Sequence, residues 1–100
     1  MTISIVEMEV PDAVRVQLSD DAIMVELRDV RTITVPLAWY PRLLHGLTEE
    51  RLNWRLIGGG EGVHWDDLDE DLSVEGLLAG RRSGESQTSL NRWLEARAGR

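Results

Sequence analysis

The sequence predicts an α+β fold: an antiparallel β-meander followed by short helices, a β-hairpin and a C-terminal helix. Apolar and polar residues alternate with a period of two over the first third of the chain, which is typical of strands with one buried face. Proline and glycine interrupt the middle of the chain, and apolar residues near its C-terminus recur at helical spacing. These patterns together predict the order of the elements.

Three strands are expected in the meander, at residues 14–18, 23–27 and 33–35. Their inward positions carry Val, Leu or Ile, and most positions between these are polar. The connections are short and polar, as at residues 19–21, so hairpins should join the strands in sequence order. Residues 1–12 are less regular: Ile3 and Ile5 either extend the first strand or lie over the sheet, and Pro11 marks a break.

Short helices are expected after the meander. Pro41 suits the first turn of a helix over residues 41–45, because its missing N–H has no helical partner there. This helix should carry Leu43 and Leu44 onto the sheet. Thr48 is the expected N-cap of a further helical turn, in which two glutamates complement the positive end of the helix dipole.

A β-hairpin is expected next, with a first strand that ends at Ile57 and a second strand at residues 63–65. The glycine-rich turn between them, residues 58–62, has one property of a phosphate-binding loop, because glycine exposes N–H groups that bind anions. A phosphate loop also needs a lysine, a serine or threonine and a following helix. Glu61 instead places a negative charge inside the turn, so a plain hairpin is the better interpretation.

Residues 61–75 hold seven acidic side chains and no arginine. Asp67, Asp69 and Asp71 mimic the first three ligand positions of a calcium-binding loop, but Leu72 stands where that loop requires glycine. We therefore expect no metal and no cofactor. The segment is then either a solvated turn anchored by its leucines or an acidic ridge that faces a partner.

Two more helices are expected toward the C-terminus. Ser73 suits the N-cap of a helix over residues 74–79, which Gly80 closes. After a polar segment, a helix over residues 86–97 should present three apolar residues and one arginine on one side: Leu90, Trp93, Leu94 and Arg97.

A chain of 100 residues has room for one domain. We expect a single α+β domain over residues 1–86 and a helical tail over residues 87–100, which packs on the domain or on a partner. The absence of cysteine excludes disulfides, thiolate zinc sites and a cysteine nucleophile. The sequence has neither a membrane-spanning apolar run nor a signal peptide, so we expect a cytoplasmic protein without membrane contact.

Charge is divided unevenly along the chain, whose net value is −7. Residues 1–80 hold 16 acids and 6 arginines, a total of −10, while residues 81–100 hold 2 acids and 5 arginines, a total of +3. A strongly acidic domain repels phosphate backbones, so direct nucleic-acid binding is not expected and a basic protein partner suits it. The alternative is that the acidity serves solubility alone.

The sequence contains no recognisable catalytic set. His64 precedes two aspartates, so a pair with Asp66 or Asp67 is conceivable, but no serine lies in a strand-to-helix elbow that would make it a nucleophile. A histidine at a strand end more often bonds a backbone carbonyl. An enzyme is therefore not expected. The alternative is a small-molecule-binding or hydrolytic domain centred on His64 and the glycine-rich loop.

Four of the five aromatic residues are tryptophan. Trp54 is expected in the core from its strand position, whereas the corner at residues 39–42 should lie at the surface, because its two aromatic rings cannot both face inward before a proline. Tryptophan and arginine are frequent in binding hot spots. The predicted partner-binding residues are Trp39, Tyr40, Arg42, Asp66, Asp67, Asp69 and Trp93.

Several runs of the sequence resemble one known family. They are VPLAWYPRL at 35–43, EER at 49–51, NW at 53–54, GGGEGVHW at 58–65, DLDED at 67–71 and SVEGLLAGRRSGES at 73–86. Over at least residues 14–86 the chain is similar to the family called domain of unknown function 2442. It departs at Val30, where the family usually turns with glycine, and at Asp66, where proline is common.

This resemblance implies a small bacterial α+β domain without an established activity, and it assigns no catalytic residue. Some relatives are fused to a helix-turn-helix, and others resemble the second member of two-gene units of the toxin–antitoxin kind. The leading hypothesis is a non-catalytic protein-interaction module, antitoxin-like, that neutralises a basic partner such as a neighbouring-gene toxin. A homodimer is compatible with it. A further hypothesis is a sensor or dimerisation domain of a transcriptional regulator.

Overall fold

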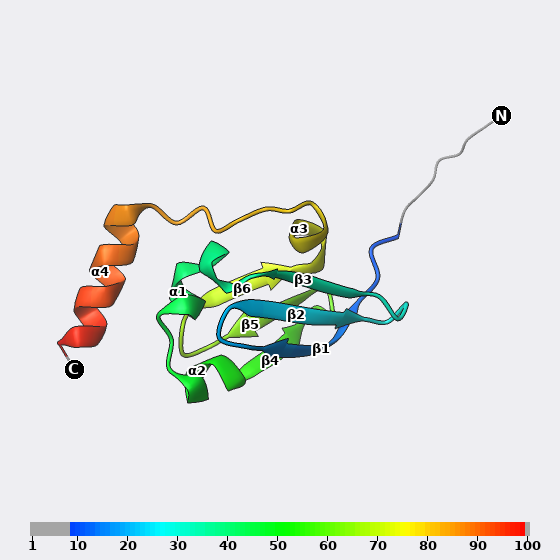
Figure 1. The fold of residues 1–100 in the computed structure, drawn as a ribbon, viewed down its shortest axis with the longest axis horizontal. Coiled ribbons are helices and arrows are strands. Elements are labelled where there is room, and N and C mark those ends of the chain that lie inside the picture. The colour runs from blue at the N-terminus through cyan, green and yellow to red at the C-terminus, as the bar shows by residue number, and fades with distance from the viewer. Residues whose placement is uncertain (1–8, 100) are drawn as a thin grey trace.

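Two three-stranded antiparallel sheets lie one over the other in the computed structural model, which describes residues 9–99 (Figure 1). The first sheet has the order β1-β2-β3, with β1 at Ala13–Leu18, β2 at Ala22–Leu27 and β3 at Thr32–Pro36. The predicted meander is therefore confirmed. The two interpretations of Ile3 and Ile5 lie outside the described residues.

The second sheet has the order β4-β5-β6, with β4 at Trp54–Ile57, β5 at Gly62–Trp65 and β6 at Glu70–Ser73. The predicted hairpin of β4 and β5 is confirmed, but β6 was not predicted and extends the hairpin into a second meander. In β6, Leu72 points into the core while Asp71 is exposed. Its acidic residues conceal the strand, because aspartate and glutamate are depleted in strands.

Helices flank the sheets. Within residues 9–99 they are η1 (Leu37–Trp39, a 3₁₀ helix), α1 (Pro41–Leu44), α2 (Thr48–Leu52), α3 (Val74–Leu78) and α4 (Gln87–Ala98). The hydroxyl of Ser73 accepts a hydrogen bond from the first turn of α3, as predicted, and Ser86 does the same for α4. In this part of the chain no helix is both long enough and apolar enough to cross a membrane.

Two predicted details of the helices are wrong. Leu44 is 39% exposed instead of packed on the sheet, because α1 is a single turn that buries only Leu43. Thr48 is the first residue of α2 rather than its N-cap. The N–H of the preceding Leu47 is bonded instead to the carboxylate of Glu50 at 2.8 Å, since a glutamate in the first turn reaches back to that position.

The apolar core lies between the two sheets and contains one fully buried tryptophan, Trp65. Its Nε1 donates a hydrogen bond to the carbonyl of Arg51 at 2.9 Å, so its polar group is satisfied. The prediction that Trp54 fills the core is only partly right. Trp54 lies opposite Trp65 but on an edge strand, so it packs half-buried at the margin.

The glycine-rich turn fastens the second sheet to the first. Gly60 has a φ of +117°, and a Cβ there would lie 2.6 Å from the Cβ of Asp12 and 2.8 Å from the carbonyl of Ala13. Its own carbonyl accepts a hydrogen bond from the N–H of Ala13 at 2.7 Å. The antiparallel pairing of β4 and β5 confirms the hairpin interpretation of this turn. The close packing of the two backbones requires glycine at position 60.

Candidate functional site

Carboxylates gather at one end of the domain, in the turn between β5 and β6 and at the start of β6. Asp66, Asp67, Asp69 and Asp71 are all exposed, and we call these four residues the acidic face. The side chains of Asp66, Asp69 and Asp71 are 58%, 85% and 67% exposed. The three aspartates predicted to bind a partner, Asp66, Asp67 and Asp69, therefore lie together in one accessible turn.

His64 lies between two carboxylates of the acidic face. The register of the second sheet places it beside Arg55 on β4 and Asp71 on β6. Its Nδ1 contacts Asp71, and its Nε2 lies 2.9 Å from Asp66 Oδ1. The conceivable pair with Asp66 is thus confirmed, and the expected bond to a backbone carbonyl is wrong because the neighbouring strand offers a carboxylate. A hydrogen bond from Arg55 is the main reason that the pKa of Asp66 is lowered.

The remaining carboxylates of the acidic face have separate neighbours. Asp67 accepts a hydrogen bond from Asn53 Nδ2 at 3.0 Å, and Asp69 Oδ2 lies 3.6 Å from Arg42 Nη1. With Asp71 turned toward the histidine, the calcium-like spacing does not converge on one point. Among residues 9–99, no group of three or more His, Asp or Glu side chains is arranged to hold a metal ion.

Arg42 was predicted to meet a partner, but its guanidinium is engaged within the chain. Its Nε and Nη2 donate to the carboxylate of Glu85 at 2.6–3.0 Å, and its Nη1 donates to the carbonyl of Leu68 at 3.4 Å. The side chains of Arg42 and Glu85 are 17% and 10% exposed. The hydrogen bond from Arg42 is the main reason that the pKa of Glu85 is lowered.

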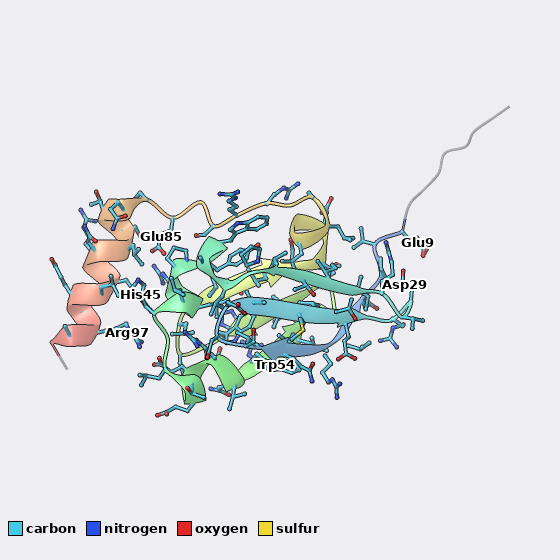
Figure 2. All side chains as sticks on the ribbon, in the orientation of Figure 1. Glu9, Asp29, His45, Trp54, Glu85 and Arg97 are labelled. Atoms are coloured by element: carbon cyan, nitrogen blue, oxygen red, sulfur yellow. The ribbon has the colours of Figure 1, made fainter. Side chains whose placement is uncertain are left out.

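The C-terminal helix α4 docks on the same end of the domain. Arg97 Nη2 lies 2.7 Å from Glu50 Oε1, and Figure 2 shows Arg97 reaching from α4 toward the body. The ring of Trp93 lies under two guanidinium groups, at 5.2 Å from Arg42 and 4.5 Å from Arg97. These cation–π contacts hold the helix through an aromatic side chain that was predicted to bind a partner.

Trp39 and Tyr40 pack against the segment that follows α3. Tyr40 is 4% exposed and donates its hydroxyl to the carbonyl of Arg81 at 2.7 Å, so the predicted surface position of Tyr40 is wrong. Trp39 is half-buried, with the guanidinium of Arg82 at 4.6 Å from its ring. The two rings indeed do not both face inward, since one fills the core and the other supports an arginine.

A cavity of about 220 Å³ lies beneath the same segment, and sequence reasoning missed it. Tyr40, Glu70, Leu77 and Arg81 are among its lining residues. Burial of the carboxyl group is the main reason that the pKa of Glu70 is raised from 4.5 to about 7. The signal that would have found this glutamate is the period-two pattern of β6, which places Glu70 and Leu72 on the same inward side.

Comparison with known proteins gives a family but no activity. The profile of one family, Protein of unknown function (DUF2442), matches residues 13–83. A protein of unknown function from Rhodospirillum rubrum has a similar structure, with a TM-score of 0.65 and 28% identity over 77% of this chain and 95% of that one. An uncharacterized protein from Chromobacterium violaceum shares the fold, with a TM-score of 0.63 and 24% identity over 81% and 74%. No curated protein matches the chain.

Proposed function

We propose the function of this chain from its surface. The chain belongs to the family described as Protein of unknown function (DUF2442), and this description names no activity. The chain acts as a non-catalytic protein-interaction module whose acidic face binds a basic protein. In its most concrete form it is the antitoxin-like member of a bacterial pair, and its partner is the basic toxin that a neighbouring gene encodes.

The acidic face is the observation that supports this function most. Its four aspartates project from a tight turn and a strand, so a partner meets carboxylates that are already in position. Two arginines touch the face, Arg55 at Asp66 and Arg42 at Asp69, and they leave it with a net negative charge. Complementary charge on a partner speeds association and discriminates against acidic competitors.

The surroundings of His64 support a non-catalytic role. A general base needs a ring nitrogen within reach of the proton that it removes. Both ring nitrogens of His64 face carboxylates instead, those of Asp66 and Asp71. The glycine-rich turn offers no second centre, since Gly60 packs against the start of β1.

Co-expression of the tagged chain with the product of its neighbouring gene tests this function. We expect a stable complex in size-exclusion chromatography with light scattering, and growth arrest when the neighbour is expressed alone. The triple variant Asp66→Asn, Asp67→Asn and Asp69→Asn should weaken the complex about tenfold or more, because it removes three charges at nearly constant shape. Asparagine also tolerates the positive φ of Asp69, which is 50°.

A matched control removes the same charge elsewhere. The triple variant Asp20→Asn, Glu49→Gln and Glu95→Gln changes three exposed acids outside the acidic face and should bind as the wild type does. A neighbour that neither binds nor arrests growth would refute the antitoxin form. Equal weakening by the two triple variants would refute the acidic face as the binding site.

One observation favours a second candidate, a small-molecule-binding domain: Glu70 lines the 220 Å³ cavity. The binding centre is then this cavity rather than His64 and the glycine-rich loop. A carboxyl group that burial holds at a pKa of about 7 suits a cationic ligand, which would restore its charge. Small amines should then raise the Tm of the wild type by about 2 °C or more and leave that of Glu70→Gln unchanged.

A further inference from the structure

α4 stands apart from the two sheets, at the end of an extended segment (Figure 1). Two ion pairs and one stacked ring hold it there. Arg42 pairs with Glu85, Glu50 pairs with Arg97, and the Trp93 ring lies near both arginines. In the ion pairs and in the stacking of Arg42 on Trp93, one partner belongs to the body of the domain and the other to α4 or the residues just before it.

These contacts form a specific docking surface. The side chains of the first ion pair are 17% and 10% exposed, and those of the second are 16% and 13% exposed. Shielded ion pairs of this kind, with two hydrogen bonds from one guanidinium, hold their geometry better than pairs at the open surface. Leu90 of α4 is 8% exposed, so an apolar side chain is covered as well.

The connection to α4 has a hinge at Gly84. The body anchors the chain up to Ser83, whose N–H donates to the carbonyl of Trp39 at 3.0 Å. At Gly84 a Cβ would meet no atom within 4 Å, so no neighbouring group packs against that side of the residue, and glycine adopts a wider range of φ than other residues. A local hydrogen bond spans it, from the Glu85 N–H to Ser83 Oγ at 3.1 Å. A hollow of about 350 Å³ lies beside this hinge.

We propose that α4 exchanges between two copies of this chain. In the exchanged dimer, Arg97 of each copy pairs with Glu50 of the other, and Glu85 pairs with Arg42. Such an exchange keeps both ion pairs and the contact of Trp93 with Arg42, and it is reciprocal, so the assembly closes with two-fold symmetry.

The docking surface fits α4 of a second copy, because that helix has the same charges in the same order along the chain as the α4 that the surface already binds. The segment that exchanges, residues 85–100, holds three arginines and two acids, a total of +1, and it is attracted by the total of −8 on residues 1–84 in either copy. The family match ends at residue 83, so it includes both sheets and leaves out α4.

Mixing two charge-reversed variants of the full chain tests the exchange. Glu50→Arg and Arg97→Glu each place like charges against one another, both within a chain and between identical chains. In an equimolar mixture, an exchanged heterodimer restores opposite charges at both docking surfaces. We expect a twofold rise in mass by light scattering for the mixture, while each variant alone stays monomeric. A mixture that stays monomeric at about 1 mM chain, an effective concentration typical of a short tether, would overturn the exchange.

The matched control reverses exposed neighbours on the same two helices. A mixture of Glu49→Arg and Arg92→Glu has the same charges away from the docking surface, and it should not form a heterodimer. An equal heterodimer in the control mixture would mean that charge attraction alone joins the chains, and would also overturn the proposal. The double variant Glu50→Arg/Arg97→Glu should behave as the wild type does.

The Glu50→Arg variant also loses the hydrogen bond that Glu50 accepts from the Leu47 N–H. A measurement on the wild type keeps this bond. Isotope-filtered NMR on a mixture of labelled and unlabelled chains at about 1 mM detects contacts between chains alone. We expect cross-peaks between the Trp93 ring of one chain and the Arg42 side chain of the other. If dimers form without these cross-peaks, the dimer uses another surface and the exchange is overturned. A solution without dimers would overturn the exchange as well.

Discussion

The guanidinium of Arg42 and the carboxylate of Glu85, 43 residues apart in sequence, form a bidentate ion pair whose shortest bond is 2.6 Å. The pair joins α1 to the residue that precedes the N-cap of α4. Both side chains are largely shielded from water, and each makes most of its hydrogen bonds with the other. The position of α4 on the domain therefore rests to a large extent on this contact.

Replacement of Glu85 by glutamine should lower the free energy of unfolding by about 1–3 kcal/mol, because the shielded guanidinium of Arg42 loses its nearest carboxylate and keeps only the longer contact with Asp69. Urea unfolding measures the change. Glu26→Gln is the matched control, since Glu26 pairs with Arg15 at the surface, where side chains are 34% and 58% exposed. The control should change the stability by less than about 1 kcal/mol. Equal effects would mean that the shielding of the first pair is unimportant.

Replacement of Gly60 by alanine should destabilise the protein by about 2 kcal/mol more than the same change at Gly59. Both glycines have positive φ, at +117° and +70°, so both variants carry backbone strain. A Cβ at Gly60 would also collide with Asp12 and Ala13, whereas a Cβ at Gly59 meets nothing within 4 Å. The comparison of the two urea midpoints isolates the contact between the sheets, and equal midpoints would contradict it.

Val30 adopts a φ of 82° at a turn where its side chain is 90% exposed. This left-handed conformation costs a β-branched residue about 1–2 kcal/mol, and glycine recovers most of it at an entropic cost of about 0.5–1 kcal/mol. Val30→Gly should therefore stabilise the protein by about 0.5–1 kcal/mol. Val14→Gly, at an exposed strand position without positive φ, should destabilise it instead. Thermal unfolding of the two variants shows whether the signs differ as expected.

The free energy of unfolding should fall as the pH rises from 4.5 to about 7, because burial raises the pKa of Glu70 from 4.5 to about 7. The unfolded chain loses this proton near pH 4.5 while the folded chain keeps it to about pH 7, so the stabilisation is complete below 4.5 and lost by about 7. Full linkage corresponds to about 3 kcal/mol, and access of water reduces this to about 1–2 kcal/mol.

Urea unfolding at several pH values checks this dependence, and Glu70→Gln should lose it. Glu85→Gln is the control with the opposite sign. The pKa of Glu85 is lowered, so the stability that its ionised carboxylate contributes is lost only as the pH falls below the usual pKa of a glutamate. A Glu70→Gln variant with the same slope as the wild type between pH 4.5 and 7 would contradict the assignment.

Local patterns predicted most of the fold. Period-two alternation marks the three strands of the first sheet, the glycine-rich turn between apolar residues marks β4 and β5, and Pro41, Ser73 and Gly80 mark the ends of short helices. β6 was not predicted because two of its four residues are acidic. Glu70 lies on its inward side, but glutamate is typical of the protein surface. The one-turn length of α1 could not be predicted either, so the exposure of Leu44 was missed.

The candidate site was predictable only where it depends on composition. The exposed turn at Asp66, Asp67 and Asp69 follows from the density of acidic residues, which solvate readily. The engagement of Arg42 and Trp93 with one another does not follow from any local pattern. The two residues are far apart in sequence, and neither one's neighbours identify the other.

The strands, the helix starts and the division of charge between body and tail all follow from the residues in order, because steric and hydrogen-bonding preferences act between near neighbours. Packing of the chain was needed to select Trp65 rather than Trp54 for the core and to pair Glu50 with Arg97. Burial and ion pairing depend on distances between remote segments, and those distances exist only once the two sheets and α4 have come together.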